Sequence, residues 1–69
     1  MKSIDATGLS CPQPVLLAKQ GLSSSPEGID ITVDNATAEQ NITRFAKNIG
    51  YSVESTNDGE LFKLAIRKK

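Results

Sequence analysis

The only cysteine of the chain stands in a setting that can prepare a reactive thiol. Residues 8–14 read GLSCPQP, and Cys11 is the single cysteine among 69 residues. Proline suits the first position of a helix, so the sequence predicts a helix that begins at Pro12 with Cys11 as its N-cap. The positive end of the helix dipole and the backbone amide of Gln13 would then favour thiolate over thiol. We therefore expect the pKa of the Cys11 thiol to lie below the free-thiol value of about 8.5.

The second proline of this segment stiffens the predicted helix start further. Pro14 falls at the third helical position, which leaves Gln13 as the only amide donor of the first turn before Val15. Cys11 is accordingly predicted at a rigid, partly exposed tip. A structural role is the alternative, because a free cysteine often behaves as a small buried hydrophobe. Spacing alone leaves both interpretations open.

Composition excludes several other kinds of chemistry. The chain has no histidine, so imidazole bases and histidine metal ligands are absent, and a lone cysteine can form neither an intrachain disulfide nor a CxxC pair. Eight Lys and Arg balance eight Asp and Glu, so there is no net positive charge to attract a nucleic-acid backbone. The longest apolar run, Val15 to Ala18, is far shorter than the roughly 20 residues of a membrane span. We expect a cytoplasmic protein without nucleic-acid or membrane partners.

Hydrophobic periodicity predicts four strands and two helices. Apolar residues alternate in residues 29–33 and 61–66, and a short strand is expected around residues 3–6. An Asp58-Gly59 step is typical of a hairpin turn, so the strand from Tyr51 should pair antiparallel with the last strand. Helices are expected from Pro12 to about residue 23 and over residues 37–49. For the first helix, the predicted inward residues are Val15, Ala18 and Leu22; for the second, they are Ala38, Ile42, Phe45, Ala46 and Ile49.

The ends of the second helix carry local signals. Thr37 and Gln40 match a capping box, and Gly50 is a natural terminator. The order of elements is then β-α-β-α-β-β. Right-handed crossovers make the first three strands parallel, and their single apolar faces require both helices on one side. We therefore predict an α/β two-layer sandwich that forms one domain over residues 1–69. The last strand is the most apolar and should lie inside the sheet, in the order 1-2-4-3.

These residues resemble a known family. The pattern Asp5-Ala6-x-Gly8-Leu9-x-Cys11-Pro12-x-Pro14 is similar to that of the TusA/SirA family of small sulfur carriers, whose defining feature is a Cys-Pro-x-Pro motif at the start of the first helix. Further matches resemble the YedF-type branch, which is associated with sulfur and selenium metabolism: Val33-Asp34-Asn35, Asn41-x-x-Arg44-Phe45 and Gly50-Tyr51. The resemblance covers essentially the whole chain and implies the same two-layer fold.

The resemblance also implies a function and a site. Cys11 would be the catalytic nucleophile, accepting sulfane sulfur as a persulfide and passing it to an acceptor protein. Pro12, Gln13 and Pro14 would fix the helix start, and Gly8 would shape the approach to it. A cysteine desulfurase or a rhodanese-like protein would donate the sulfur, and no cofactor or metal is implied.

Two other classes of function compete with this one. A non-catalytic regulatory or interaction domain could bind a protein partner through the open face of the sheet or through Leu17, which the helical spacing predicts to be exposed. RNA binding is suggested only by analogy of architecture with a translation-factor domain. Zero net charge and three aromatic residues argue against RNA, because stacking platforms need exposed rings.

Overall fold

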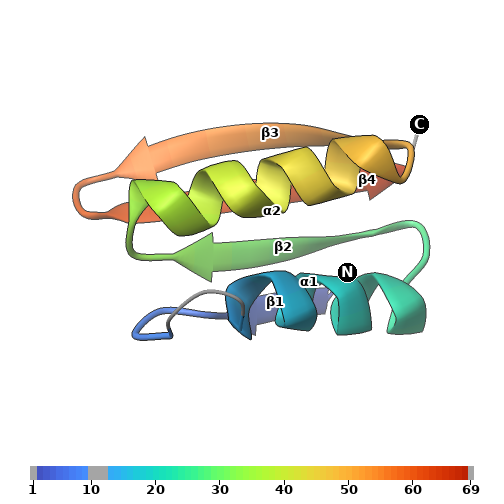
Figure 1. The fold of residues 1–69 in the computed structure, drawn as a ribbon, viewed down its shortest axis with the longest axis horizontal. Coiled ribbons are helices and arrows are strands. Elements are labelled where there is room, and N and C mark those ends of the chain that lie inside the picture. The colour runs from blue at the N-terminus through green and yellow to red at the C-terminus, as the bar shows by residue number, and fades with distance from the viewer. Residues whose placement is uncertain (1, 10–12, 69) are drawn as a thin grey trace.

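Two helices and a four-stranded sheet make up the described part of the chain (Figure 1). The computed structural model describes residues 2–9 and 13–68. Along the chain, the elements are β1 (Lys2–Asp5), α1 (Gln13–Ser24), β2 (Gly28–Val33), α2 (Ala36–Asn48), β3 (Tyr51–Asp58) and β4 (Leu61–Lys68). This order confirms the predicted β-α-β-α-β-β succession. The predicted helix start at Pro12 lies outside the described residues.

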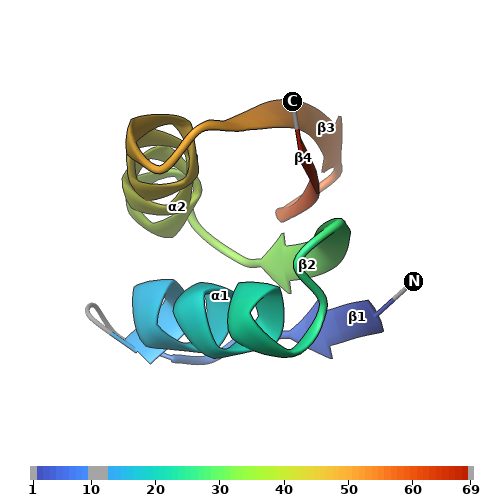
Figure 2. The ribbon, with the colours of Figure 1, turned by 90° about the vertical axis from the view of Figure 1, so that its right-hand side faces the viewer.

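The sheet has the predicted strand order β1-β2-β4-β3. β1 pairs parallel with β2, and β4 pairs antiparallel with both β2 and β3, so β1, β2 and β3 all point the same way. Both helices lie on one face of the sheet, which Figure 2 shows edge on. The predicted two-layer sandwich with a mixed sheet is therefore confirmed.

The core lies between the sheet and the helices. β2 and β4 are the central strands, and the alternation predicted for them is confirmed: Ile29, Ile31 and Val33 are buried, as are Leu64 and Ile66. Register brings these side chains together in pairs, with Ile29 opposite Ile66 and Ile31 opposite Leu64. The apolar character of β4 follows from its central position, where both edges are hydrogen-bonded and one face is covered.

Gly21 lets isoleucine side chains of the sheet approach the backbone of helix α1 closely. A Cβ atom added at Gly21 would lie 2.5 Å from Ile4 Cδ1 and 3.0 Å from Ile29 Cδ1. Such separations are below ordinary van der Waals contact, so a side chain at position 21 would have to push the ends of two isoleucine side chains aside. A helix-interior glycine costs helix stability, and its presence here is explained by this contact.

The inward face of α1 differs in part from the prediction. Ala18 and Leu22 are buried as expected, and Val15 packs against the core while partly exposed. Leu17 was predicted to face solvent, but it is also partly buried against the core; Leu16 is the exposed leucine, at 43%. The prediction was wrong because α1 contacts α2 as well as β1 and β2, so its apolar stripe is wider than a sheet contact alone requires.

Helix α2 begins one residue earlier than predicted and has a different cap. Asn35 is the N-cap, and its side-chain oxygen accepts a hydrogen bond of 2.7 Å from the Ala38 amide. The Thr37 capping box is therefore wrong, since Thr37 already lies within the helix. The helix ends before Gly50, as predicted, with the Gly50 amide donating to the Lys47 carbonyl at 3.1 Å. Ile49 was predicted to face the core but is 48% exposed, because it is the C-cap residue, beyond the last helical turn.

In the final hairpin, the turn lies one residue later in the sequence than predicted. Asp58 pairs with Leu61, so Gly59 and Glu60 form the two-residue loop in place of the predicted Asp58-Gly59 pair. Gly59 has a φ of 65°, whereas the φ of Glu60 is not positive. This pattern is typical of a type II′ hairpin turn, which has glycine at the first loop position. The strand that begins at Tyr51 extends to Asp58 and forms one edge of the sheet.

Neither helix in the described part of the chain is long and apolar enough to cross a membrane.

Candidate functional site

The Cys-Pro-x-Pro segment leads into helix α1. Of the predicted site residues, Gly8, Gln13 and Pro14 are described, whereas Cys11 and Pro12 lie outside the described residues. Gln13 is exposed and opens α1 as it is described. Pro14 is almost fully buried. The second proline of the motif is therefore a core residue as well as a predicted constraint on the helix start.

The chain is anchored to the core on both sides of the motif. Ala6 is fully buried, and its amide continues the β1–β2 pairing with a 2.8 Å hydrogen bond to the Thr32 carbonyl. Leu9 packs against the core cluster, two residues before Cys11. Pro14 is buried three residues after Cys11. The described flanks of the motif are thus held by packing within a few residues of the cysteine.

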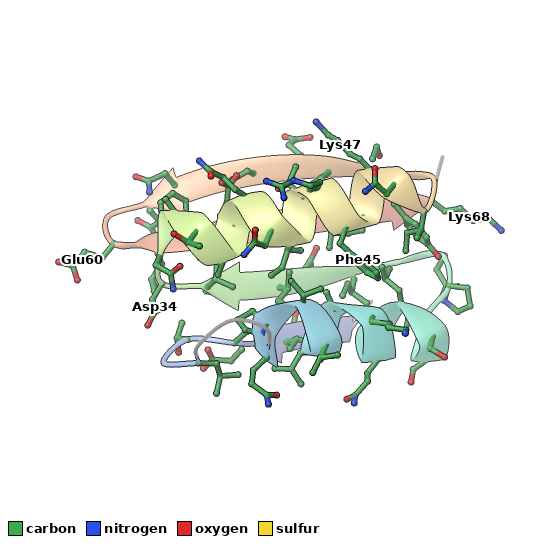
Figure 3. The ribbon with its side chains drawn as sticks, viewed as in Figure 1. Asp34, Phe45, Lys47, Glu60 and Lys68 are labelled. Carbon is green, nitrogen blue, oxygen red and sulfur yellow. The ribbon has the colours of Figure 1, made fainter. Side chains whose placement is uncertain are left out.

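Asp34 makes a long-range contact to the segment before the motif. The Gly8 amide donates a 2.8 Å hydrogen bond to Asp34 Oδ2, although the two residues are 26 positions apart. Gly8 has a φ of 76°, a conformation that glycine adopts without steric cost. Figure 3 shows Asp34 where β2 ends and α2 begins. Gly8 was predicted to shape the approach to the motif, and that role stays a prediction.

The hydrogen bonds around Asp34 continue to helix α2. Asn35 Nδ2 donates to Asp34 Oδ1 at 3.2 Å, and the same Asn35 side chain accepts from the Ala38 amide. A continuous path of hydrogen bonds therefore joins Gly8, Asp34, Asn35 and the first turn of α2. The segment before the motif is tied to an element that begins 36 residues into the chain.

A second carboxylate stabilises the turn that follows β1. The hydroxyl and the amide of Thr7 both donate to Asp5 Oδ1, at 2.7 and 3.0 Å. The hydroxyl bond and then the amide bond lower the pKa of the Asp5 carboxyl from its ordinary value of 3.8, because both favour the ionised form. Thr7 is thereby held by a local ring of hydrogen bonds directly before Gly8.

The roles of Asp5 and Asp34 were not identified from the sequence. Asp5-x-Thr7 is a recognisable signal, because an aspartate often accepts hydrogen bonds from a residue two positions later. The Gly8 contact of Asp34 has no comparable local signal. It depends on the parallel pairing of β1 with β2, which brings the ends of both strands to the same edge of the molecule.

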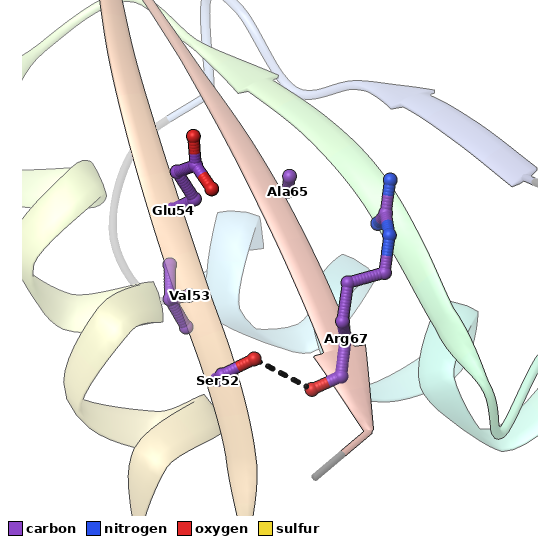
Figure 4. A pocket seen from close by; sticks show the side chains of 5 residues that line it. All are labelled: Ser52, Val53, Glu54, Ala65 and Arg67. Atoms are coloured by element: carbon purple, nitrogen blue, oxygen red, sulfur yellow. Dashed lines mark hydrogen bonds between the residues drawn. The ribbon is translucent and has the colours of Figure 1, made fainter.

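A shallow hollow lies on the sheet face that the helices leave open. It is lined by Ser52, Val53, Glu54, Ala65 and Arg67 (Figure 4). Arg67 is committed to other contacts, with Nη2 2.8 Å from Asp30 Oδ1 and Nη1 bonded to the carbonyls of Ile29 and Ile66. Helix α1 lies on the opposite face of the sheet, so this hollow is away from Gln13 and Pro14.

The fold and the segment together define a class: small two-layer α/β domains with one cysteine in a Cys-Pro-x-Pro segment before the first helix. Comparison with known families specifies the class further. The chain belongs to the TusA family, since the family model described as "Sulfurtransferase TusA" matches residues 2–68. The predicted TusA/SirA membership is confirmed, and the assignment to the YedF-type branch stays a prediction.

Individual relatives agree with the family assignment. The chain is 42% identical over 71 residues to a Methanocaldococcus jannaschii protein whose name gives a sulfur-carrier role as provisional, with 99% of this chain and 95% of the relative covered. It is 31% identical over 70 residues to the sulfur carrier protein TusA of Allochromatium vinosum, with 97% and 92% covered. The crystal structure of a SirA-like protein from Desulfitobacterium hafniense superimposes with a TM-score of 0.88, at 34% identity, covering 97% of this chain and 96% of that chain.

Proposed function

We propose that this protein is a sulfur carrier in which the Cys11 thiolate accepts sulfane sulfur from a donor protein and passes it to an acceptor protein. The observation that carries the proposal is the family match over residues 2–68, which includes the whole Cys-Pro-x-Pro segment. Cys11 is the only cysteine of the chain, so it is the only residue that can form a persulfide. The relatives named as sulfur carriers support the same role.

The transfer needs a thiolate and two partners in succession. Cys11–S⁻ attacks the terminal sulfur of a donor persulfide, R–S–SH; a new S–S bond forms, the donor S–S bond breaks, and R–S⁻ leaves. The product is Cys11–S–SH, which carries the proton of the donor persulfide. An acceptor thiolate then attacks the terminal sulfur and releases Cys11–S⁻. The sulfur moves at one oxidation level, so neither step consumes an oxidant or a reductant.

Donors of this chemical type include cysteine desulfurases and rhodanese-like proteins, which hold sulfane sulfur on a cysteine of their own. A lone carrier thiol must remain reduced between transfers, and this favours a reducing compartment such as the cytoplasm. The anchored flanks of the motif fit the same role. Leu9 and Pro14 pack against the core, so partners approaching the cysteine meet a segment whose two ends are held.

Transfer from a cysteine desulfurase tests the proposal directly. The protein is incubated with the desulfurase and ³⁵S-cysteine, and protein-bound label is measured with mass spectrometry of the cysteine-containing peptide. Wild-type protein should carry label that thiols release, on a peptide one sulfur atom heavier. Cys11→Ser should carry none.

A displaced thiol provides the matched control. Ser23 is exposed near the end of α1, so Cys11→Ser combined with Ser23→Cys keeps one thiol in the chain but moves it away from the motif. This variant should be labelled far more slowly than wild type. Label retained by Cys11→Ser, or equal labelling of the displaced thiol, would reject the assignment of Cys11. A wild-type protein that is never labelled would favour the non-catalytic interaction domain.

A further inference from the structure

We infer that Asp34 is a positioning residue for Cys11: its carboxylate holds the segment that leads into the motif. This inference rests on the proposed function, because it assigns a task at the same site. In the described part of the segment between β1 and α1, the hydrogen bond from the Gly8 amide to the Asp34 side chain joins the chain to a residue 26 positions away. It acts on the chain three residues before the cysteine.

Asp34 is well placed to act as a fixed support. It follows Val33, which is fully buried in central strand β2, and it precedes Asn35, which caps α2. The positions of its neighbours are therefore set by the sheet on one side and by a helix on the other. The carboxylate accepts a hydrogen bond from the Gly8 amide and so restrains the position of Gly8, whose backbone has a positive φ.

Both carboxylate oxygens are in use, and this explains why the residue is an aspartate. Oδ2 accepts from the Gly8 amide and Oδ1 accepts from Asn35 Nδ2. A carboxylate is acceptor-only, so it satisfies two donors at once. An asparagine at position 34 would present one oxygen and one NH₂ group, and the NH₂ group would face a donor. Asp34→Asn therefore breaks one of the two bonds with almost no change in side-chain size.

The proposed task of Asp34 predicts the sign of an effect on the thiol. If the bond keeps Cys11 at the start of α1, its loss removes the helix-terminal stabilisation of the thiolate, and the pKa of Cys11 rises. If Asp34 acted only through its negative charge, its removal would favour the thiolate and the pKa would fall. The two explanations therefore predict opposite shifts.

The test measures the rate of Cys11 alkylation by iodoacetamide as a function of pH, which gives the thiol pKa. We expect Asp34→Ala to raise the pKa toward the free-thiol value of about 8.5 and to slow alkylation at pH 6.5 by about three- to tenfold. Asp34→Glu keeps the charge but moves the carboxylate one methylene further from the backbone, so it should also raise the pKa, and it serves as the test if the alanine variant does not fold. Hydrogen exchange at the Gly8 amide should become at least about tenfold faster in Asp34→Ala.

Two control variants separate positioning from charge and from global stability. Asp58→Ala removes an equal charge at an exposed site, where the carboxylate forms a 3.9 Å ion pair with Lys63. Asn35→Ala removes the cap of α2 but leaves Asp34 able to accept from Gly8. Neither should raise the pKa of Cys11. An unchanged or lowered pKa in Asp34→Ala, or an equal rise in either control, would overturn the inference. The alkylation measurement needs no sulfur donor, so it is independent of the labelling that tests the carrier function itself.

Discussion

Replacing Asn35 by alanine tests the account of how α2 begins. The Asn35 side-chain oxygen accepts from the Ala38 amide at 2.7 Å, and its NH₂ group donates to Asp34 at 3.2 Å. Alanine removes both bonds and leaves the Ala38 amide without that acceptor. Position 35 is exposed, so the substitution creates no cavity, and the loss of stability reports on the hydrogen bonds alone.

The expected loss can be estimated from the cap. An N-cap asparagine replaced by alanine costs typically about 1 kcal/mol, within a range of about 0.5–2. An unfolding entropy of about 2.1 cal/mol/K per residue gives about 0.14 kcal/mol/K for 69 residues. A loss of about 1 kcal/mol therefore lowers the Tm by about 7 °C. Urea denaturation should show a lower midpoint with an unchanged slope.

Two further substitutions isolate the source of the effect. Thr37→Ala removes the side chain that the sequence pattern alone selects as the cap, and it should change stability by less than about 0.5 kcal/mol. Asn35→Ser keeps a capping oxygen but not the donor to Asp34, and it should recover most of the loss. The reasoning is refuted if Thr37→Ala is more costly than Asn35→Ala, or if Asn35→Ala leaves the midpoint unchanged.

Three other predictions concern separate contacts. Gly21→Ala should lower the free energy of unfolding by about 1 kcal/mol in urea titrations, because crowding against two isoleucines outweighs the better helix propensity of alanine; a stabilised variant would contradict the close approach. Thr7→Val should raise the pKa of Asp5 toward 3.8, as followed by carboxyl NMR. The folded-state pKa of Asp5 is lowered, so Asp5 contributes stability above its unfolded-state pKa, and this stability is lost as the pH falls through the folded-state pKa. Thr7→Val should therefore lose less stability than wild type on acidification below about pH 4. Equal losses in the two proteins would contradict this. Tyr51→Phe removes a 2.7 Å bond to the Pro26 carbonyl and should cost about 0.5–1.5 kcal/mol by thermal denaturation; no change would mean that water replaces the bond fully.

Most of the fold follows from patterns that are local in the sequence. Alternation identified β2 and β4, and the high apolar content around Leu64 and Ile66 placed β4 inside the sheet, as the structure confirms. Patterns with several local solutions were less reliable. Thr37 matched a capping box, yet Asn35, two residues earlier, is the cap because the chain leaves β2 there. Leu17 was predicted to be exposed but packs against the core, since α1 contacts both the sheet and α2.

The parts of the site that could not be predicted depend on contacts between distant residues. The motif itself is visible in the sequence, and so is the preference of Asp5 for Thr7. The bond between Gly8 and Asp34 joins residues 26 positions apart, and its existence depends on the parallel register of β1 and β2. Gly21 is a similar case: within its helix it has no evident purpose, and only the approach of Ile4 and Ile29 explains it.

The central position of β4 has a consequence for how the protein is made. β4 is the last of the four strands along the chain, yet it joins the β1–β2 pair to β3. In a nascent chain that still lacks residues 61–68, the inner edge of β2 has no strand to pair with. Ile29 and Ile31 then lack the residues that stand opposite them in the sheet, Ile66 and Leu64. Translation must therefore deliver β4 from the ribosome before the sheet can close, and a message truncated within it would leave β3 without its partner strand.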